Sequence, residues 1–355
     1  MDKIIKKFLP GNKVPKVQFE GKLSYRKRLA LRIFSTSFLG KIIWIIFRTV
    51  LLLGISYINL FPFLYKISSS FMSPNDFVDV TVKLIPKYPT LDQYRFIIIE
   101  NEYFLALWNT ASLSLMVAFM QTLICAFIGY GFAKFKFKGR GILFMAVIIT
   151  MVVPHQTIML SMFMKFRYFD LFGVFKGLNG LLDYAKTASA SVKMLNPDGT
   201  FNFLNTNWPL IMLSLTGLAF KNGLYIFIFR QFYKGVPDEL EEAAYVDGSG
   251  IFKTYFRIIL PLTVPIMVTI FMFAFSWQWT DNFYTSLFYT TSGAHMLPDI
   301  VVVPASLNMT FSANDLYTSA IINTASLLVI LPLFIIFLFA QNALIEGVER
   351  SGIVG

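Results

Sequence analysis

The sequence has little charge and only one cysteine. Charged residues make up 14% of the 355 residues and hydrophobic residues 56%, whereas average soluble domains carry about 25% charged residues. A soluble core cannot bury so much apolar side chain, which excludes an ordinary soluble globular protein. The single cysteine, Cys125, allows no disulfide within the chain.

The sequence also lacks the motifs of common catalytic sites. It contains no Gly-x-x-x-x-Gly-Lys-Ser/Thr loop to hold nucleotide phosphates, and the Gly-Ser-Gly at 248–250 has neither the lysine nor the spacing. The two histidines, His155 and His295, lie in no metal-ligand or triad arrangement. We therefore expect no enzyme activity, no ATPase site, no metal and no cofactor bound by this chain.

What the sequence has instead is long apolar runs. A helix needs about 20 apolar residues to cross the hydrocarbon of a bilayer. Runs of this kind occur at 49–68, 106–130, 141–163, 209–231, 258–280 and 316–340. The sequence thus predicts an all-α membrane protein with six transmembrane helices. The first run starts too late for a cleaved signal peptide, and we expect it to act as a signal anchor.

Lysine and arginine indicate the orientation, because they are enriched in cytoplasmic segments near helix ends. Twelve of them precede the first run, against the acids Asp2 and Glu20, and "KFKFKGR" at 134–140 adds four more. The loop at 281–315 has three aspartates and no lysine or arginine. We expect cytoplasmic N- and C-termini. The basic segment 1–47 is either an amphipathic helix on anionic lipid or a topology signal.

The connection at 232–257 departs from this charge pattern. On the predicted topology it is cytoplasmic, yet it holds five acids and three bases. Pro237 and the acids after it favour a helix start, and Gly248 favours a stop. A short helix, a turn and a second helix entering the fifth run are predicted. The acids either face water on a solvated helix or pair with cations of a docked partner.

The spacing in this connection resembles a known family. The cytoplasmic signature of permease subunits of ABC importers is Glu-Ala-Ala, followed by three residues, Gly, nine residues, Ile, one residue and Leu-Pro. Its fixed positions here are Glu242, Ala243, Ala244, Gly248, Ile258, Leu260 and Pro261. The flanks "FIFRQFYKGVPDELEEAAYVDGSG" and "ILPLTVP" resemble the carbohydrate-uptake branch.

The resemblance covers nearly the whole chain. "INLFPFLYKISSSF", "WNTASLS", "YGFAKFKFKGR" and "VPHQTIML" resemble the first helices and loop of the family, and "QNALIEGVERSGIVG" resembles its C-terminal tail. In the family that tail reaches toward the ATPase pair, which points here to Gly352, Val354 and Gly355. Ser249 and Ile353 depart from the usual residues.

The resemblance implies a type I ABC importer permease fold with a permease domain at 48–346 and a cytoplasmic tail at 347–355. It implies a carbohydrate, expected to be an oligosaccharide, imported by alternating access across a bacterial cytoplasmic membrane. Expected partners are a second homologous permease, two ATPase subunits that bind ATP and Mg²⁺, an extracellular substrate-binding protein and membrane lipid, with no nucleic acid. The coupling residues would be Glu241, Glu242, Ala243, Ala244, Asp247, Gly248, Ile258, Leu260 and Pro261.

Polar residues inside the runs are candidates for the translocation path, because a charge at a helix centre costs about 2.5–3.5 kcal/mol to insert. Lys221 lies near the middle of the fourth run; it meets a wet cavity or a structural partner, or the helix boundary is misplaced. The aromatic and amide groups at the end of the fifth run either bind sugar or form an interfacial belt. The candidates are Lys221, Asn222, His155, Gln156, Trp277, Gln278 and Asn323.

Three alternatives remain for function: an importer of another solute, a secondary transporter or channel, and a scaffold for soluble partners without transport. One extracellular feature is also predicted. The signature is shared with importers of peptides, amino acids or ions. A secondary transporter is a different class, for which inverted repeats or broken helices are expected. Outside the membrane, "VKMLNPDGTFNFL" within the insertion 180–207 predicts a small hairpin, either beneath the binding protein or without a contact.

Overall fold

The computed structural model describes residues 36–171, 173–174, 196, 200–290, 295–307 and 315–350. These residues are helical or irregular, and within them the strand pairing is limited to an isolated antiparallel bridge between Phe169 and Phe201. The chain divides into two units, Met1–Leu64 and Tyr65–Gly355. The all-α class predicted from the sequence is confirmed.

The first unit contains most of helix α2, Thr36–Ser69. Its segment Gly40–Ser69 is long and apolar enough to span a membrane, and none of its most apolar window is buried inside the protein. The helix begins earlier than the predicted start at residue 49. Lys41 and Arg48 do not end it, because their long side chains can extend toward a membrane surface while the helix continues.

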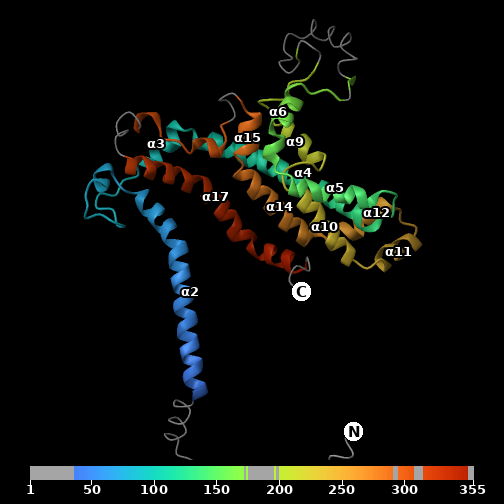
Figure 1. Ribbon diagram of the computed structural model, residues 1–355, viewed down its shortest axis with the longest axis horizontal. Coiled ribbons are helices and arrows are strands. Elements are labelled where there is room, and N and C mark those ends of the chain that lie inside the picture. The colour runs from blue at the N-terminus through green and yellow to red at the C-terminus, as the bar shows by residue number, and fades with distance from the viewer. Residues whose placement is uncertain are drawn as a thin grey trace, which may run out of the picture. The chain divides into compact units, whose positions relative to one another are not determined.

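The second unit holds the remaining helices (Figure 1). The α-helices are α3 (Asp92–Glu100), α4 (Tyr103–Lys134), α5 (Arg140–Val152), α6 (Met159–Arg167), α9 (Trp208–Leu215), α10 (Asn222–Gly235), α11 (Glu239–Val246), α12 (Ile251–Thr254), α13 (Leu260–Leu262), α14 (Val264–Trp279), α15 (Phe283–Phe288) and α17 (Asp315–Arg350). The 3₁₀ turns are η2 (Pro74–Phe77), η3 (His155–Ile158) and η5 (Leu297–Ile300), and η4 (Tyr255–Ile259) is a π-helical turn.

The predicted spans are only partly continuous. Among the described residues, three helices are long and apolar enough to cross a membrane: α2, α4 and α17. Two bent pairs raise this number to five when each counts as one span: Arg140–Val152 with His155–Arg167, bent by 98°, and Ile251–Leu262 with Val264–Trp279, bent by 76°. The predicted run 209–231 is not among them, because α9 and α10 are separate helices.

The breaks have local causes. Pro154 has no N–H to donate and forces the residue before it out of the helical region, so α5 ends at Val152 and Val153 is extended. Between α9 and α10 the chain turns at Gly217 and Lys221, both with positive φ. Glycine adopts this conformation without strain, whereas lysine does so at a cost, so the surrounding structure must hold Lys221 in place.

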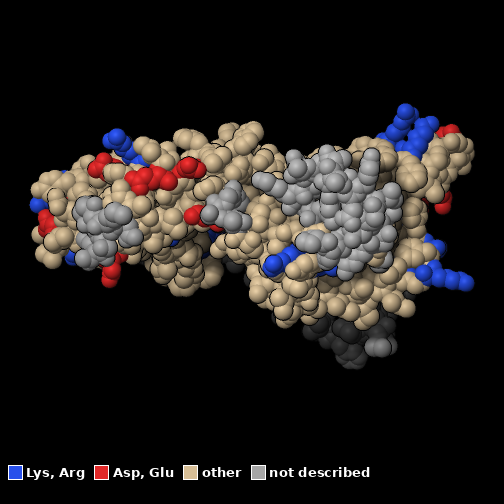
Figure 2. All heavy atoms as spheres, turned by 90° about the horizontal axis from the view of Figure 1, so that it is seen from above, with Lys and Arg blue, Asp and Glu red and all other residues tan. Residues whose placement is uncertain are grey.

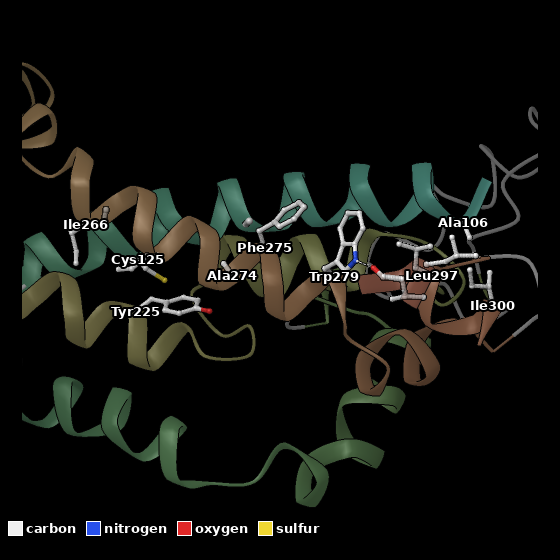
Figure 3. Close-up of a cluster of buried hydrophobic side chains, with 14 of the residues drawn as sticks. Ala106, Cys125, Tyr225, Ile266, Ala274, Phe275, Trp279, Leu297 and Ile300 are labelled. Carbon is white, nitrogen blue, oxygen red and sulfur yellow. Dashed lines mark hydrogen bonds between the residues drawn. The ribbon is translucent and has the colours of Figure 1, made fainter. Parts of the chain in front are cut away.

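Helices α4, α10, α14 and α17 form the centre of the second unit, with α4 against α10 and α14, and α14 against α17 (Figure 1). Figure 3 shows side chains of the buried cluster between them, including Cys125, Tyr225 and Phe275. The indole N–H of Trp279 donates to the Val329 carbonyl over 2.9 Å, which joins α14 to α17.

A buried amide ties together the end of the molecule that carries α3. Gln93 is fully buried, and its Nε2 donates to the carbonyls of Ser69 and Met72, at 3.2 and 2.9 Å. Its Oε1 accepts from the Thr324 hydroxyl of α17 at 2.6 Å. Every polar atom of this side chain is therefore paired, as burial in an apolar bundle requires.

Candidate functional site

The acidic connection is ordered as a helix, a turn and a helix, which we call the elbow and define as residues 236–254. Helix α11 starts at Glu239, with the Asp238 carbonyl accepting from the backbone N–H groups of Glu241 and Glu242, each at 3.0 Å. Gly248, at φ +77°, ends it before α12. The predicted stop at Gly248 is confirmed, while Pro237 lies just before the cap and not at the first helical position.

The inner face of the elbow is fixed by the last residue of α4. Lys134 Nζ lies 2.5 Å from Asp238 Oδ1, 3.4 Å from Glu241 Oε1 and 2.7 Å from the Val236 carbonyl. The side chains of Lys134 and Glu241 are 8% and 9% exposed, whereas that of Asp238 is 79% exposed. The elbow is thus joined to the end of α4 by a mostly buried ion pair.

Tyrosines complete this contact. The Tyr130 hydroxyl, one turn before Lys134, donates to Glu241 Oε2 at 3.3 Å. The Tyr130 ring lies 4.7 Å from that of Tyr255 in η4 and 5.5 Å from that of Tyr233 in α10, centroid to centroid. Four segments of the chain therefore meet at one point. Outside the spans, the hydrogen bond from Lys134 holds the pKa of the Asp238 carboxyl below its usual range.

The predicted coupling residues divide between two faces of the elbow. Successive residues of a helix point about 100° apart. Glu241 and Ala244 face the bundle and are buried, while Glu242 and Ala243 are exposed. Glu241 is therefore engaged within the chain and does not offer its carboxylate to a partner, contrary to the interpretation of the acids as one docking set. The remaining exposed members are Asp247 and Gly248.

Beyond the elbow, the chain reaches α14 through an irregular segment. Tyr255–Ile259 forms the π-helical turn, within which Ile258 is half-buried. Leu260 and Pro261 lie in α13, and a bend of 76° separates Ile251–Leu262 from α14. The second helix of the elbow leads into the fifth span, as predicted, but that span is bent and not one straight helix. A π-helical turn and a proline at the start of α14 change the direction.

A cavity of about 200 Å³ lies where two of the broken spans face each other. One wall comes from Thr150 through Gln156 at the end of α5, and the other from Gly217 through Lys221 between α9 and α10 together with Gly223 and Leu224 of α10. The predicted path residues His155, Gln156 and Lys221 are brought together here. Thr150 was not predicted, because one threonine in an apolar run carries no distinguishing signal.

The ammonium group of Lys221 sits against aromatic rings. Its Nζ lies 4.6 Å from the ring centroid of Phe220 and 4.8 Å from that of Trp277. Such positions are favourable because the ring faces carry negative partial charge. Phe220 was missed by sequence analysis, although it is adjacent to Lys221.

A second, smaller cavity adjoins the first through Phe220. It is lined by Gln121, Phe220, Ala274, Trp277, Gln278, Asp281 and Tyr284. The Tyr284 hydroxyl lies 2.5 Å from Nδ1 of His155, so the two cavities share a hydrogen-bonded wall. Trp277 is thus placed beside Lys221, and Gln278 lines the adjoining small cavity.

Other candidates lie elsewhere. Asn222 is completely buried, and neither polar atom of its side-chain amide has a hydrogen-bond partner among the described residues. Asn323 is half-buried on α17 and lines neither cavity. Trp279, which neighbours the candidate pair, belongs to the core.

Three predicted features fall wholly or largely outside the described residues. The tail residues Gly352, Val354 and Gly355 and the N-terminal residues 1–35 are not described, although α17 continues through Arg350 into the predicted tail. Of the predicted hairpin in 180–207, the Asn196 N–H donates to the Thr200 carbonyl at 2.8 Å. Phe201 then pairs with Phe169.

Comparisons with known proteins bear on these sites. A family model described as "Binding-protein-dependent transport system inner membrane component" matches residues 123–350, which include the elbow, the larger cavity and all residues of the smaller cavity except Gln121.

Curated relatives match almost end to end. The chain is 23% identical to the galactooligosaccharides transport system permease protein GanQ of Bacillus subtilis (strain 168), over 88% of this chain and 96% of that protein. It is 27% identical to the arabinooligosaccharides transport system permease protein AraQ of the same strain, over 86% and 95%. It is 25% identical to the maltose/maltodextrin transport system permease protein MalG of Vibrio parahaemolyticus, over 83% and 91%.

Among solved structures, the fold resembles a chain of a bacterial ABC transporter involved in the import of the acidic polysaccharide alginate. The TM-score is 0.62 at 17% identity, and the likeness covers 87% of this chain and 98% of that chain. At this identity the likeness concerns the fold alone.

Proposed function

Because this chain belongs to the family of binding-protein-dependent transport system inner membrane components, we propose that it is a permease subunit of an ATP-driven importer of oligosaccharides. The observation that carries this proposal is the end-to-end match to permeases named for galactooligosaccharides, arabinooligosaccharides and maltodextrins. It is a protein of the cytoplasmic membrane.

The proposed assembly contains a second, homologous permease, two ATPase subunits and an extracellular substrate-binding protein. ATP and Mg²⁺ bind to the ATPase subunits, and this chain supplies the path and the coupling element without hydrolysing ATP. The distribution of charge supports cytoplasmic placement of the elbow. In Figure 2, acidic side chains predominate over a few basic ones at the end where α3 lies in Figure 1, and basic side chains predominate over a few acidic ones at the end of α11 and α12.

The elbow transmits the motion of the ATPase subunits. Its exposed face, with Glu242 and Ala243, fits a cleft of an ATPase subunit, because small side chains permit close approach. Its inner face is attached to α4 through Lys134 and to α14 through η4. Movement of the elbow as a rigid body therefore shifts α4 and α14 together, and these helices wall the small cavity. Alternating access follows when that wall moves.

Broken helices do not by themselves favour a secondary transporter here. We expected them for that class, and two bent pairs occur in the described part of this chain. The family match and the elbow favour an ATP-driven importer instead, because a secondary transporter has no need of a docking element.

Reconstitution tests the proposal. The tagged chain should co-purify with an ATPase subunit and a related permease. In liposomes with the binding protein, the complex should accumulate an oligosaccharide only with ATP. Uptake of peptides or amino acids but no saccharide would show that the proposed substrate class is wrong. Uptake driven by an ion gradient without the ATPase would show that the proposed ATP-driven mechanism is wrong.

A charge reversal on the elbow tests coupling. Glu242→Lys combined with Gly248→Pro should abolish transport-coupled ATP hydrolysis, because the substitutions change the charge and shape of the exposed face. An assembled complex whose coupled hydrolysis is unchanged would contradict the role of the elbow.

A further inference from the structure

Lys221 has no carboxylate to balance its charge among the residues that the structure describes. The ion pairs of these residues join Lys87, Lys134 and His295 to acids, and none includes Lys221. The rings of Phe220 and Trp277 attract the ammonium group, yet they leave its net charge in place. A cation within a membrane-spanning region is costly and is retained where it meets water, a counterion or a substrate.

The cavity gives this charge an open site. Lys221 occupies the break between α9 and α10 with φ +67°, and it lines a space of about 200 Å³ together with His155 and Gln156. In transporters, breaks of this kind place polar groups and the positive ends of half-helices around the solute. Helix α10 starts directly after Lys221, so its positive end adds to the charge of the lysine.

The carboxylate of the nearby acid, Asp281, already accepts hydrogen bonds from the backbone. Asp281 lines the adjoining small cavity, and its carboxylate accepts from the backbone N–H groups of Tyr284 and Thr285, at 3.3 and 2.9 Å. In the same cavity, Nε2 of Gln278 is buried without a hydrogen-bond partner among the residues that the structure describes. A donor and a cation thus lie at two adjoining cavities, both lined by Phe220.

These features suit a saccharide that carries a negative charge. Aromatic faces contact sugar rings, an amide donor orients a hydroxyl or carboxyl oxygen, and an ammonium group pairs with a carboxylate. A neutral sugar would leave the Lys221 charge unpaired in the occupied site.

We propose that Lys221 binds a carboxylate of the transported solute, and that the importer carries acidic, uronate-containing oligosaccharides. This inference rests on the proposed function and narrows its substrate class. It makes Lys221 a specificity-determining residue of the path.

The test uses the complete complex in liposomes with its binding protein. The probes are trisaccharides of galacturonate, mannuronate or glucuronate, each compared with its carboxyl-reduced neutral counterpart. Wild-type complex should take up at least one uronate trisaccharide in preference to its neutral counterpart. Lys221→Met should lower the rate for that uronate about tenfold, the loss of one charge-assisted hydrogen bond, while Lys221→Arg should retain most of it.

A matched control separates this effect from a general loss of positive charge. Lys138→Met removes an exposed lysine from the loop after α4 and should leave uronate uptake unchanged. Because all variants use the same binding protein, the selectivity of that protein cancels in the comparison.

Each of the following outcomes would overturn the inference. If wild-type complex imports only neutral saccharides, or Lys221→Met transports the uronate normally, Lys221 does not read a substrate charge. If Lys221→Met loses the second permease on purification, the lysine pairs with an acid of that subunit instead. If no saccharide is imported at all, the proposed function fails as well, which distinguishes the two failures.

Discussion

The ammonium group of Lys134 lies 3.4 Å from the carboxylate of Glu241, and both side chains are more than nine-tenths buried. These residues are the last of α4 and the third of α11, so the pair joins a membrane-spanning helix to the elbow. Buried ion pairs add little net stability, but removing one partner is costly because the other charge remains. The pair therefore fixes the position of the elbow.

Glu241→Gln should destabilise the chain. The substitution leaves the Lys134 charge with the exposed Asp238 and a carbonyl, so we expect a loss of about 2–4 kcal/mol in unfolding free energy. Thermal unfolding of the purified chain in detergent measures this. The control, Glu242→Gln, removes an exposed carboxylate from the next position and should leave the midpoint unchanged. Equal midpoints for the two variants would show that the pair does not hold the elbow.

The close crossing of α4 and α10 gives a second prediction. A Cβ at Gly129 would lie 2.6 Å from Cβ of Phe229 and 3.1 Å from the Arg230 backbone nitrogen. Gly129→Ala should therefore cost about 1–3 kcal/mol of stability. Gly131, two residues along the same helix, has nothing within 4 Å of an added Cβ. Gly131→Ala should be neutral or slightly stabilising. Thermal unfolding again measures both variants. Equal effects of Gly129→Ala and Gly131→Ala would show that α4 and α10 do not cross closely at Gly129.

Hydropathy alone located the long apolar helices α2, α4 and α17, because apolar runs of spanning length leave few alternatives in the sequence. The breaks were missed, although Pro154 and Gly217 are visible in the sequence. A hydropathy window averages over about 19 residues and does not respond to a single proline or a positive φ. Nothing in the sequence indicated the positive φ of Lys221, because lysine seldom adopts that conformation.

The sequence indicated some features of the candidate sites and missed others. The spacing around Glu242 located the elbow, because a docking helix needs small residues and a stop in fixed order. Which glutamate faces inward depends on Lys134, more than a hundred positions away, and no local pattern reveals that contact. Lys221 was noticed because a charge in an apolar run is rare, whereas its aromatic partner Phe220 was hidden among many phenylalanines.

The loop before α3 should respond to acid. Hydrogen bonds from the Thr81 side chain and backbone, and one from Lys87, lower the pKa of Asp79 from 3.8 to about 2. A carboxyl with a depressed folded pKa stabilises the folded state above its unfolded pKa, and this contribution is lost as the pH falls toward the folded value. The difference in Tm between wild type and Asp79→Asn should thus be constant from neutral pH to about pH 5, and shrink between 3.8 and about 2. A difference that grows on acidification would contradict this sign.

Cysteine labelling can test both the side and the contact of the elbow. The single cysteine, Cys125, is completely buried, so the wild-type chain should not react with a membrane-impermeant maleimide. Val246, at the end of α11, is 88% exposed, and Val246→Cys gives that face an accessible thiol while Cys125 stays buried. If the elbow is cytoplasmic, intact cells should show no labelling, whereas inside-out vesicles stripped of ATPase subunits should label. Rebinding the ATPase subunits should then protect the thiol, because the proposed coupling places α11 in their cleft. Labelling in intact cells would show that the elbow lies outside the cell. Labelling of the stripped vesicles that the ATPase subunits do not reduce would contradict the coupling role. The location of the elbow and its contact with the ATPase subunits are thus tested separately.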